Sequence, residues 1–283
     1  VLETGLGGRL DATNIIPKKI CSIIMPISFD HQEFLGNTLA KITKEKLGIV
    51  KNSDFVIISK QNKEVRNVIK NKLLKFSNVY YYGNNYGVKK IDKKKFEFKF
   101  KSKRIIVNKP NLNGYHQIEN ASVALTFSEI ISQKNYNINF NKVNNAIKNT
   151  KWPGRLEIIN YKNKKIIFDG SHNIDGAKKL KEFLKTQRIK PTVLFGMLKN
   201  KKIDDFLNII KFQVKNILAI KIPDEDNSIK VNEIANRCKA LSIDCIKINN
   251  VKSAIKFINN SNQKIFLITG SLYLVGKVRK KFL

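Results

Sequence analysis

Short apolar runs separated by helical periodicity organise the first part of the chain. Residues 20–27 and 54–59 have the length and the β-branched composition of buried strands. Residues 37–49, between them, space their apolar side chains as an amphipathic helix does. A helix over 65–76 and a strand over 79–82 continue the pattern. Because strands that alternate with helices form parallel sheets, this part of the chain predicts βαβ units.

The pattern then changes twice. Residues 96–107 alternate apolar and charged positions, which predicts an antiparallel hairpin with one buried face. Helices are expected over 116–131 and 141–148, and the sequence Trp152-Pro153-Gly154 then interrupts the helical spacing. We therefore expect a domain boundary near 149–153, which divides the chain into residues 1–150 and 151–283.

The second part alternates strands and helices regularly. Strands are predicted near 156–161, 166–169, 192–195, 217–220, 244–248 and 265–269. Helical spacing fills most of the intervals, so we expect a mostly parallel, Rossmann-like sheet with helices on both faces. The fold class is α/β.

Composition limits the class of protein. A length of 283 residues and a hydrophobic fraction of 42% are sufficient for two folded cores. No apolar run approaches the roughly 18 residues of a membrane span, and no signal-peptide pattern is present. The three cysteines have neither metal-ligand spacing nor a C-x-x-C pair. We expect a cytoplasmic monomer with reduced thiols and no membrane partner.

The formal net charge of +32 suggests a second class, a basic nucleic-acid-binding module. Lysine is spread along the whole chain together with abundant asparagine and isoleucine, whereas a nucleic-acid site gathers basic and aromatic residues on one face. Residues 89–103 are the best local exception, and their alternation also fits a plain antiparallel strand. We therefore expect no specific nucleic-acid partner.

The opening segment carries the most specific chemical signal. Glu3 follows the apolar pair Val1-Leu2, and a glycine-rich turn follows it. Magnesium-nucleotide enzymes place a carboxylate at such a strand end. No stretch matches G-x-x-x-x-G-K-[ST], the loop that wraps nucleotide phosphates in these enzymes. We expect an N-terminally truncated fragment whose phosphate loop lies upstream; the alternative is a natural short protein that lacks this loop.

Several motifs occur in one order along the chain. They are ETGLGGRLDATN at 3–14, FDHQEFLG at 29–36, KEKLGIVK at 44–51, HQIENA at 116–121, KWPGRLE at 151–157, FDGSHN at 168–173 and TGSLYLVG at 269–276. Together they resemble the folylpolyglutamate synthase/dihydrofolate synthase family of the Mur ligase superfamily. The resemblance implies the C-terminal part of a P-loop-type central domain, residues 1–150, followed by a glutamate-ligase domain, residues 151–283.

The resemblance also implies an activity. Members of the family use ATP to add L-glutamate to dihydropteroate or to a folate through an acyl phosphate, with two Mg²⁺ ions and, in some members, a monovalent cation. The sequence does not decide between the two acceptors. Without a phosphate loop, we expect residues 1–283 alone to be inactive. A Mur ligase of cell-wall synthesis shares the architecture, but the GGRLDATN and WPGR strings favour the folate family.

Matching motif positions imply roles for particular residues. Glu3 and His31 correspond to metal ligands, and Lys46 to a lysine that is carbamylated and then holds Mg²⁺. Each also has a purely structural interpretation: a turn carboxylate, a helix-entry histidine and a solvated helix lysine. Leu10, Asp11 and Ala12 correspond to contacts with the pterin-bearing substrate, with a turn and a helix cap as the alternative.

The remaining assignments concern ATP and glutamate. Asn120, Arg155 and Asp169 correspond to ATP-binding positions, which implies a nucleotide held between the two domains. His172 corresponds to a catalytic position near the acyl phosphate. Ser271 corresponds to a contact with the glutamate carboxylate, although a serine before a helix is more often a cap.

Overall fold

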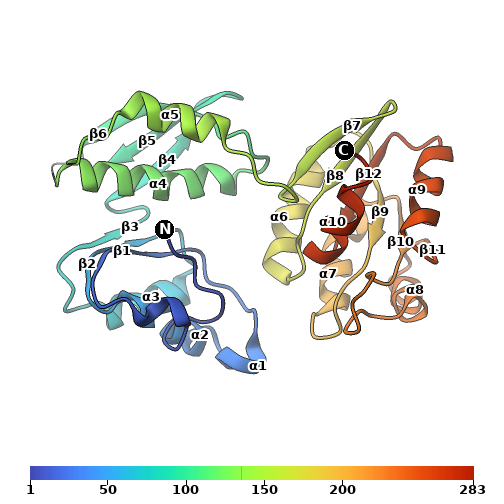
Figure 1. Cartoon of the computed structure of the whole chain (residues 1–283), viewed down its shortest axis with the longest axis horizontal. Helices are drawn as coiled ribbons and strands as arrows, with labels where there is room; N and C mark the ends of the chain where they lie inside the picture. Colours follow the sequence, from blue (N-terminus) through green and yellow to red (C-terminus); the bar gives the residue numbers. More distant parts are fainter. Residues whose placement is uncertain (135) are drawn as a thin grey trace. The chain divides into compact units, whose positions relative to one another are not determined.

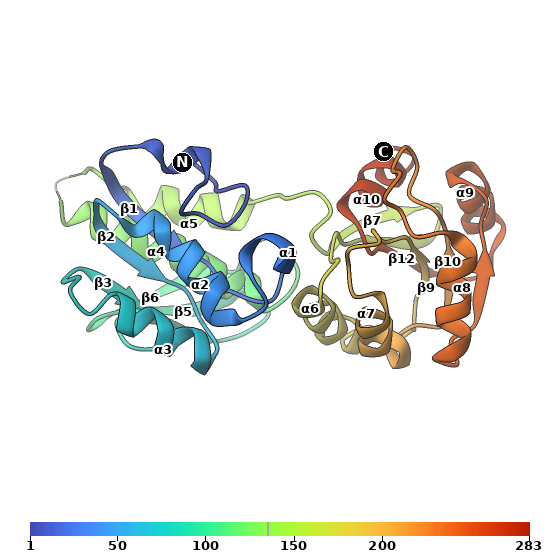
Figure 2. The ribbon, with the colours of Figure 1, turned by 90° about the horizontal axis from the view of Figure 1, so that it is seen from below.

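The computed structural model describes residues 1–134 and 136–283, which divide into two compact units. Unit 1 comprises Val1–Asn111 and Tyr115–Thr150, and unit 2 comprises Leu112–Gly114 and Lys151–Leu283. Figures 1 and 2 show the elements of each unit. Each unit has its own sheets and its own core, and is described separately below.

The first sheet of unit 1 is parallel. Its strands are β1 (Lys19–Ile24), β2 (Ser53–Ile58) and β3 (Val79–Tyr81), in the order β1-β2-β3. Helices α2 (Leu39–Leu47) and α3 (Lys63–Lys72) cover one face, where Ile42 and Val65 join Val56 in a buried cluster. The side chains of Thr38 and Asn62 cap the two helices. The predicted βαβ arrangement is confirmed.

The second sheet of unit 1 is antiparallel. Its strands are β4 (Tyr86–Lys90), β5 (Lys95–Phe100) and β6 (Lys103–Asn108). Phe96, Phe98 and Phe100 are buried in one cluster with residues of β2 and of α4 (His116–Ser132). The aromatic residues of the basic stretch therefore face a core and are not available for stacking on bases. Helix α5 (Phe140–Asn149) packs on β6.

Unit 2 is built on a six-stranded sheet. Its strands are β7 (Glu157–Tyr161), β8 (Lys164–Phe168), β9 (Thr192–Phe195), β10 (Asn216–Ala219), β11 (Cys245–Lys247) and β12 (Ile265–Thr269). The order is β11-β10-β9-β12-β8-β7, and every neighbouring pair is parallel except β7 with β8. The predicted mostly parallel sheet is confirmed, with β12 inserted between β8 and β9.

Helices cover both faces of this sheet. Helices α6 (Ile174–Lys185), α7 (Ile203–Ile210) and α8 (Val231–Ala240) contribute to one buried cluster, and α9 (Val251–Asn260) and α10 (Leu272–Arg279) to the other. Parallel strands end at one edge of the sheet, so the loops after β8, β9 and β12 meet there. Most of the candidate residues of unit 2 lie in these loops.

Several details differ from the prediction. A short helix, α1 (Gln32–Leu35), and 3-10 turns at Ala12–Ile15, Gly48–Val50 and Lys211–Gln213 were not predicted, since single turns have little periodicity. Strand β4 was also missed. No helix within the described residues is long and apolar enough to cross a membrane.

Candidate functional site

The glycine-rich loop of unit 1 is organised by Asp11. Its carboxylate accepts hydrogen bonds from the backbone N–H groups of Gly5, Leu6 and Thr13, each at 3.0 Å, and from the Thr13 hydroxyl at 2.6 Å. The hydroxyl of Thr13 is the largest of the contributions that lower the Asp11 pKa to about 2. The Asp11 side chain therefore holds the turn closed. This geometry is that of a turn and a helix cap, the structural alternative to a substrate contact.

This loop packs on the C-terminal end of α2. The Arg9 N–H donates to the Glu45 carbonyl at 2.9 Å, and Arg9 Nε lies 3.0 Å from Glu45 Oε1. A Cβ on Gly8 would lie 3.0 Å from the carbonyl oxygens of Glu45 and Lys46. The half-buried Lys46 thus occupies the helix turn on which the loop rests. The structure brings together two motifs that are about thirty residues apart in sequence.

Because Gly48 lies in the tightest contact of this interface, we expect a single methyl group added there to lower the stability of the protein. A Cβ on Gly48 would lie 2.4 Å from both Cα and Cβ of Arg9, so the loop must move. We expect Gly48→Ala to lower the free energy of unfolding by about 1–3 kcal/mol. Urea unfolding followed by circular dichroism measures it. Gly87→Ala is the control, because nothing lies within 4 Å of its added Cβ; equal stability of the two variants would contradict the interface.

The same loop contacts α1, which begins after His31. A Cβ on Gly7 would lie 2.9 Å from Leu35 of that helix. His31 has a left-handed backbone, with φ of 49°, and its Nε2 lies 4.0 Å from Asp30 Oδ1. The loop therefore touches α2, which carries Lys46, and α1, which begins next to His31. Glu3 is exposed at the start of the same segment.

No preformed metal site follows from this arrangement. Within residues 1–134 and 136–283, no group of three or more His, Cys, Asp or Glu side chains could hold an ion. The donor set nevertheless fits Mg²⁺, which takes few protein ligands and completes its octahedron with water and substrate phosphate oxygens. A carboxylate, an imidazole and a carbamate on neighbouring segments would be sufficient for such an ion.

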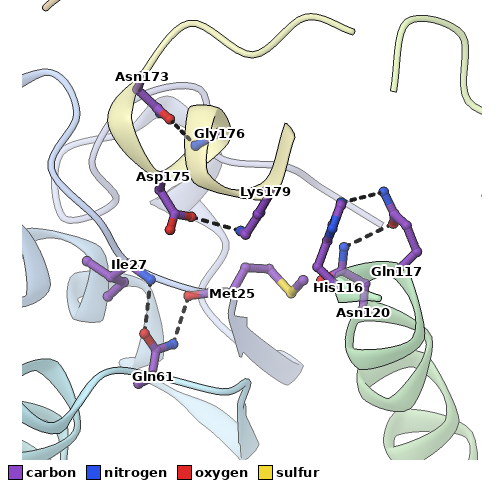
Figure 3. Close-up of polar contacts among 10 residues, drawn as sticks. All are labelled: Met25, Ile27, Gln61, His116, Gln117, Asn120, Asn173, Asp175, Gly176 and Lys179. Atoms are coloured by element: carbon purple, nitrogen blue, oxygen red, sulfur yellow. Dashed lines mark hydrogen bonds and ion pairs between the residues drawn. The ribbon is translucent and has the colours of Figure 1, made fainter. Parts of the chain in front are cut away.

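Gln61, which lies in none of the sequence motifs, connects the loops that follow β1 and β2. Its Oε1 accepts from the Ile27 N–H and its Nε2 donates to the Met25 carbonyl, both at 2.9 Å. Figure 3 shows the two hydrogen bonds. A side-chain amide has a donor and an acceptor, so it can bridge two backbone groups of one loop. An isolated glutamine after a strand has no sequence signal of this role.

A salt bridge connects the same edge to α4. Lys60 Nζ lies 2.7 Å from Glu119 Oε1, and the carboxylate raises the lysine pKa. One residue further along α4, Asn120 Nδ2 donates to Gln117 Oε1 at 3.2 Å (Figure 3). The candidate ATP residue Asn120 thus lies in the first turns of a helix that is anchored to the carboxyl end of β2.

Asp169 organises the site of unit 2. It follows β8 and is 4% exposed, and its two oxygens accept from the N–H groups of Leu156 and Ser171, each at 3.1 Å. Burial raises the Asp169 pKa, while these hydrogen bonds and the Arg155 charge oppose the shift. Each oxygen of Asp169 accepts a hydrogen bond, which is consistent with an ionised carboxylate. Asp169 therefore holds the loop of Arg155 against its own loop.

His172 and Asn173 complete the loop after β8. Nδ1 of His172 lies 2.9 Å from the Gly170 carbonyl oxygen, and since a carbonyl only accepts, that nitrogen carries a proton. Asn173 caps α6 by accepting from the Gly176 N–H at 2.8 Å (Figure 3). The imidazole is therefore oriented by the backbone of its own turn, three residues beyond Asp169.

Ser271 joins this group from the loop after β12. The Gly270 N–H donates to the Ser171 carbonyl at 3.1 Å, which connects the two loops. Ser271 is 3% exposed, and its hydroxyl accepts from the Tyr273 N–H at 3.1 Å as the cap of α10. The hydroxyl thus has the geometry of a helix cap. Asp169, His172, Arg155 and Ser271 nevertheless meet at one edge of the sheet.

Comparison with known protein families supports this architecture. Residues 5–128 match the family described as Mur ligase middle domain, and residues 155–281 match the family described as dihydrofolate synthetase, C-terminal domain. Among solved structures, E. coli FolC in complex with DHPP and ADP has a TM-score of 0.85 at 21% identity, covering 99% of this chain and 65% of that one. Folylpolyglutamate synthase from Thermotoga maritima has a TM-score of 0.79 at 27% identity, covering 100% of this chain and 65% of that one.

Curated sequences give the same result. A probable dihydrofolate synthetase of Schizosaccharomyces pombe is 31% identical over 298 residues, which cover 98% of this chain and 69% of that protein. A dihydrofolate synthase/folylpolyglutamate synthase of Bacillus subtilis is 28% identical and covers 99% and 66%, respectively. The chain thus spans about two thirds of the length of these relatives. It belongs to the folylpolyglutamate synthase/dihydrofolate synthase family.

Proposed function

We propose that the protein is an ATP-dependent ligase that adds L-glutamate to dihydropteroate, to tetrahydrofolates, or to both. The observation that carries the proposal is the meeting of Arg155, Asp169 and His172 at the carboxyl edge of the unit 2 sheet, in a chain of this family. A relative in Bacillus subtilis is named for both activities. A related E. coli structure holds DHPP and ADP.

The proposed reaction has two steps. A carboxylate oxygen of the folate or pteroate attacks the γ-phosphorus of ATP, and ADP leaves. The amine of glutamate then attacks the acyl carbon, inorganic phosphate leaves, and the amine loses a proton. Because water would hydrolyse the acyl phosphate, the residues near it must position the amine and exclude solvent.

In unit 1, Glu3, His31 and carbamylated Lys46 would hold Mg²⁺. When bound, such ions neutralise phosphate charge and align the reacting oxygens. The contacts of the Gly5–Asn14 loop with both α1 and α2 support this assignment. A monovalent cation could also bind, but none of the contacts described above points to its site.

The same loop would receive the pterin-bearing substrate. Leu10 is 81% exposed and Ala12 is exposed, so both are accessible to a ligand. Asp11 is engaged in four hydrogen bonds and would act by fixing the turn. We propose apolar contacts from Leu10 and Ala12, and positioning by Asp11.

The nucleotide and glutamate assignments divide between the units. Asn120 of unit 1 would contact ATP, and the exposed Arg155 of unit 2 would pair with phosphate. Asp169 would order the Arg155 loop. We propose that His172 lies near the acyl phosphate. Ser271 would act on glutamate through the N-terminus of α10, since its own hydroxyl caps that helix.

The test measures ADP release with ATP, Mg²⁺, glutamate and either dihydropteroate or tetrahydrofolate. We expect the protein expressed from the whole reading frame that contains residues 1–283 to release ADP only when both glutamate and one of the acceptors are present. The preferred acceptor identifies the activity. ADP release that is indifferent to glutamate would contradict the proposal.

We further propose that residues 1–283 release no ADP by themselves. They contain no G-x-x-x-x-G-K-[ST] sequence, so they supply no loop of that kind for the γ-phosphate. The same assay on purified residues 1–283 tests this point. Acceptor-dependent ADP release by this segment would contradict it.

A further inference from the structure

The loop of Arg155 is fixed on both sides of that residue. The Gly154 N–H donates to Glu157 Oε2 at 2.9 Å, and the Gly154 carbonyl accepts from the Gly170 N–H at 2.8 Å. On the other side, the Leu156 N–H donates to Asp169. Leu156 has a left-handed backbone, with φ of 49°, which is uncommon for a residue other than glycine, so the hydrogen bond from its N–H to Asp169 helps to hold this path; Gly154 adopts its φ of 72° without strain.

Glu157 also forms a two-pronged ion pair with Arg279. Arg279 Nε donates to Glu157 Oε2 at 2.8 Å, and Nη2 donates to Oε1 at 2.7 Å. The two side chains are only 21% and 23% exposed, which limits solvent screening. Such bidentate contacts are stronger than an ordinary surface ion pair. The pairing lowers the Glu157 pKa and raises the Arg279 pKa.

This pair connects two segments that are far apart in the chain. Arg279 is the last residue of α10, and the helix begins next to Ser271. Oε2 of Glu157 is shared between Arg279 Nε and the Gly154 N–H. The position of α10 therefore determines where that oxygen lies, and the oxygen determines the Gly154 peptide next to Arg155. Neither Glu157 nor Arg279 has a role in the proposed reaction.

We propose that Glu157 and Arg279 are positioning residues that present the Arg155 guanidinium to the phosphates of the nucleotide. This inference rests on the proposed function for the identity of the ligand. Loss of either side chain would release the Gly154 peptide and let the exposed Arg155 sample other directions. Affinity for phosphorylated nucleotides would fall, while contacts to the base and the ribose would remain.

The first test is a nucleotide titration by calorimetry, using the complete protein and the variants Glu157→Gln and Arg279→Gln. We expect each variant to bind ATP about 3–10-fold more weakly, a change comparable to the loss of one ordinary hydrogen bond, because Arg155 keeps its charge and loses only its fixed direction. Affinity for adenosine should not change. The double variant should be no weaker than the weaker single variant, because the two residues act as a unit. A purely structural defect would weaken adenosine and ATP alike.

Arg237→Gln is the matched control. Arg237 pairs with Asp204 and Glu233 in the same unit, away from the Arg155 loop. It should bind ATP within about twofold of the unchanged protein, as expected for an exposed ion pair. ATP affinity unchanged in both Glu157→Gln and Arg279→Gln would overturn the inference.

The second test needs no nucleotide. Amide hydrogen exchange of Gly154 should be slow in the unchanged protein and in Arg237→Gln. It should be about 10-fold faster in Glu157→Gln and in Arg279→Gln, because the side-chain oxygen that accepts from this N–H is no longer held in place. Unchanged Gly154 exchange would overturn the inference by itself. If the unchanged protein bound no ATP, the proposed function would fail, and the exchange would still decide whether the ion pair fixes the loop.

Discussion

Replacing Lys46 by alanine is expected to lower glutamate ligation at least about 100-fold, the usual cost of losing a group that stabilises charge in the transition state. The expectation rests on the place of Lys46 in the last turn of α2, beneath the glycine-rich loop. Only a neutral amine captures carbon dioxide, so Lys46→Arg should be equally inactive, because a guanidinium stays charged. Initial rates of ADP release with saturating substrates measure the effect.

Lys44→Ala is the matched control. Lys44 lies on the same helix turn but is exposed, and it should keep activity within about twofold, as expected of a solvated surface charge. Mass spectrometry of the unchanged protein under neutral conditions should find one added carbon dioxide that is absent from Lys46→Arg. Full activity of Lys46→Ala would remove Lys46 from the site.

Asp169→Ala is expected to have the largest effect on stability. Its removal leaves the buried N–H of Leu156 and the half-buried N–H of Ser171 without their acceptor. An unsatisfied buried donor costs about 1–3 kcal/mol and a half-buried donor costs less, so the two together should lower the free energy of unfolding by about 2–4 kcal/mol. Urea unfolding followed by circular dichroism measures the effect.

Asp175→Ala is the control in the same unit. Asp175 forms an exposed ion pair with Lys179 at 2.8 Å (Figure 3), and its loss should cost less than about 1 kcal/mol. If the Asp169 and Asp175 variants had equal midpoints, Asp169 would not hold the loops together.

The pH dependence of Asp169 follows from its raised pKa. A carboxyl whose pKa is higher in the folded state binds more protons there than in the unfolded chain. Its contribution therefore favours the folded state at low pH and is lost as the pH rises from the ordinary Asp range through the raised pKa. Asp169→Asn removes this titration. The stability difference between the unchanged protein and Asp169→Asn should narrow as the pH rises through that window.

The buried strands were predictable because their signal is local. Residues 192–195 and 265–269 are the bounds of β9 and β12, since runs of buried β-branched residues end sharply at polar or glycine positions. Strand β4 was missed because it contains Gly87 and two exposed lysines, and its partner strand decides its conformation. The strand order β9-β12-β8 could not be predicted from the sequence either, because the tertiary fold decides which strands pair.

The candidate site was predictable only as a set of motifs. The motifs indicate Asp169, His172 and Arg155, but the contacts that join their loops run through backbone groups that no side-chain pattern reveals. Glu157 lies inside the KWPGRLE motif, so its position could have suggested a role. Arg279 could not have been found, because a basic residue at a helix end is common for electrostatic reasons alone.

The most direct test of the ligase assignment is mass spectrometry of the folate product. The complete protein is incubated with ATP, Mg²⁺, isotopically labelled glutamate, and dihydropteroate or tetrahydrofolate. We expect an acceptor that is heavier by one labelled glutamyl residue, formed together with an equal amount of ADP. Release of ADP without any labelled product from either acceptor would contradict it.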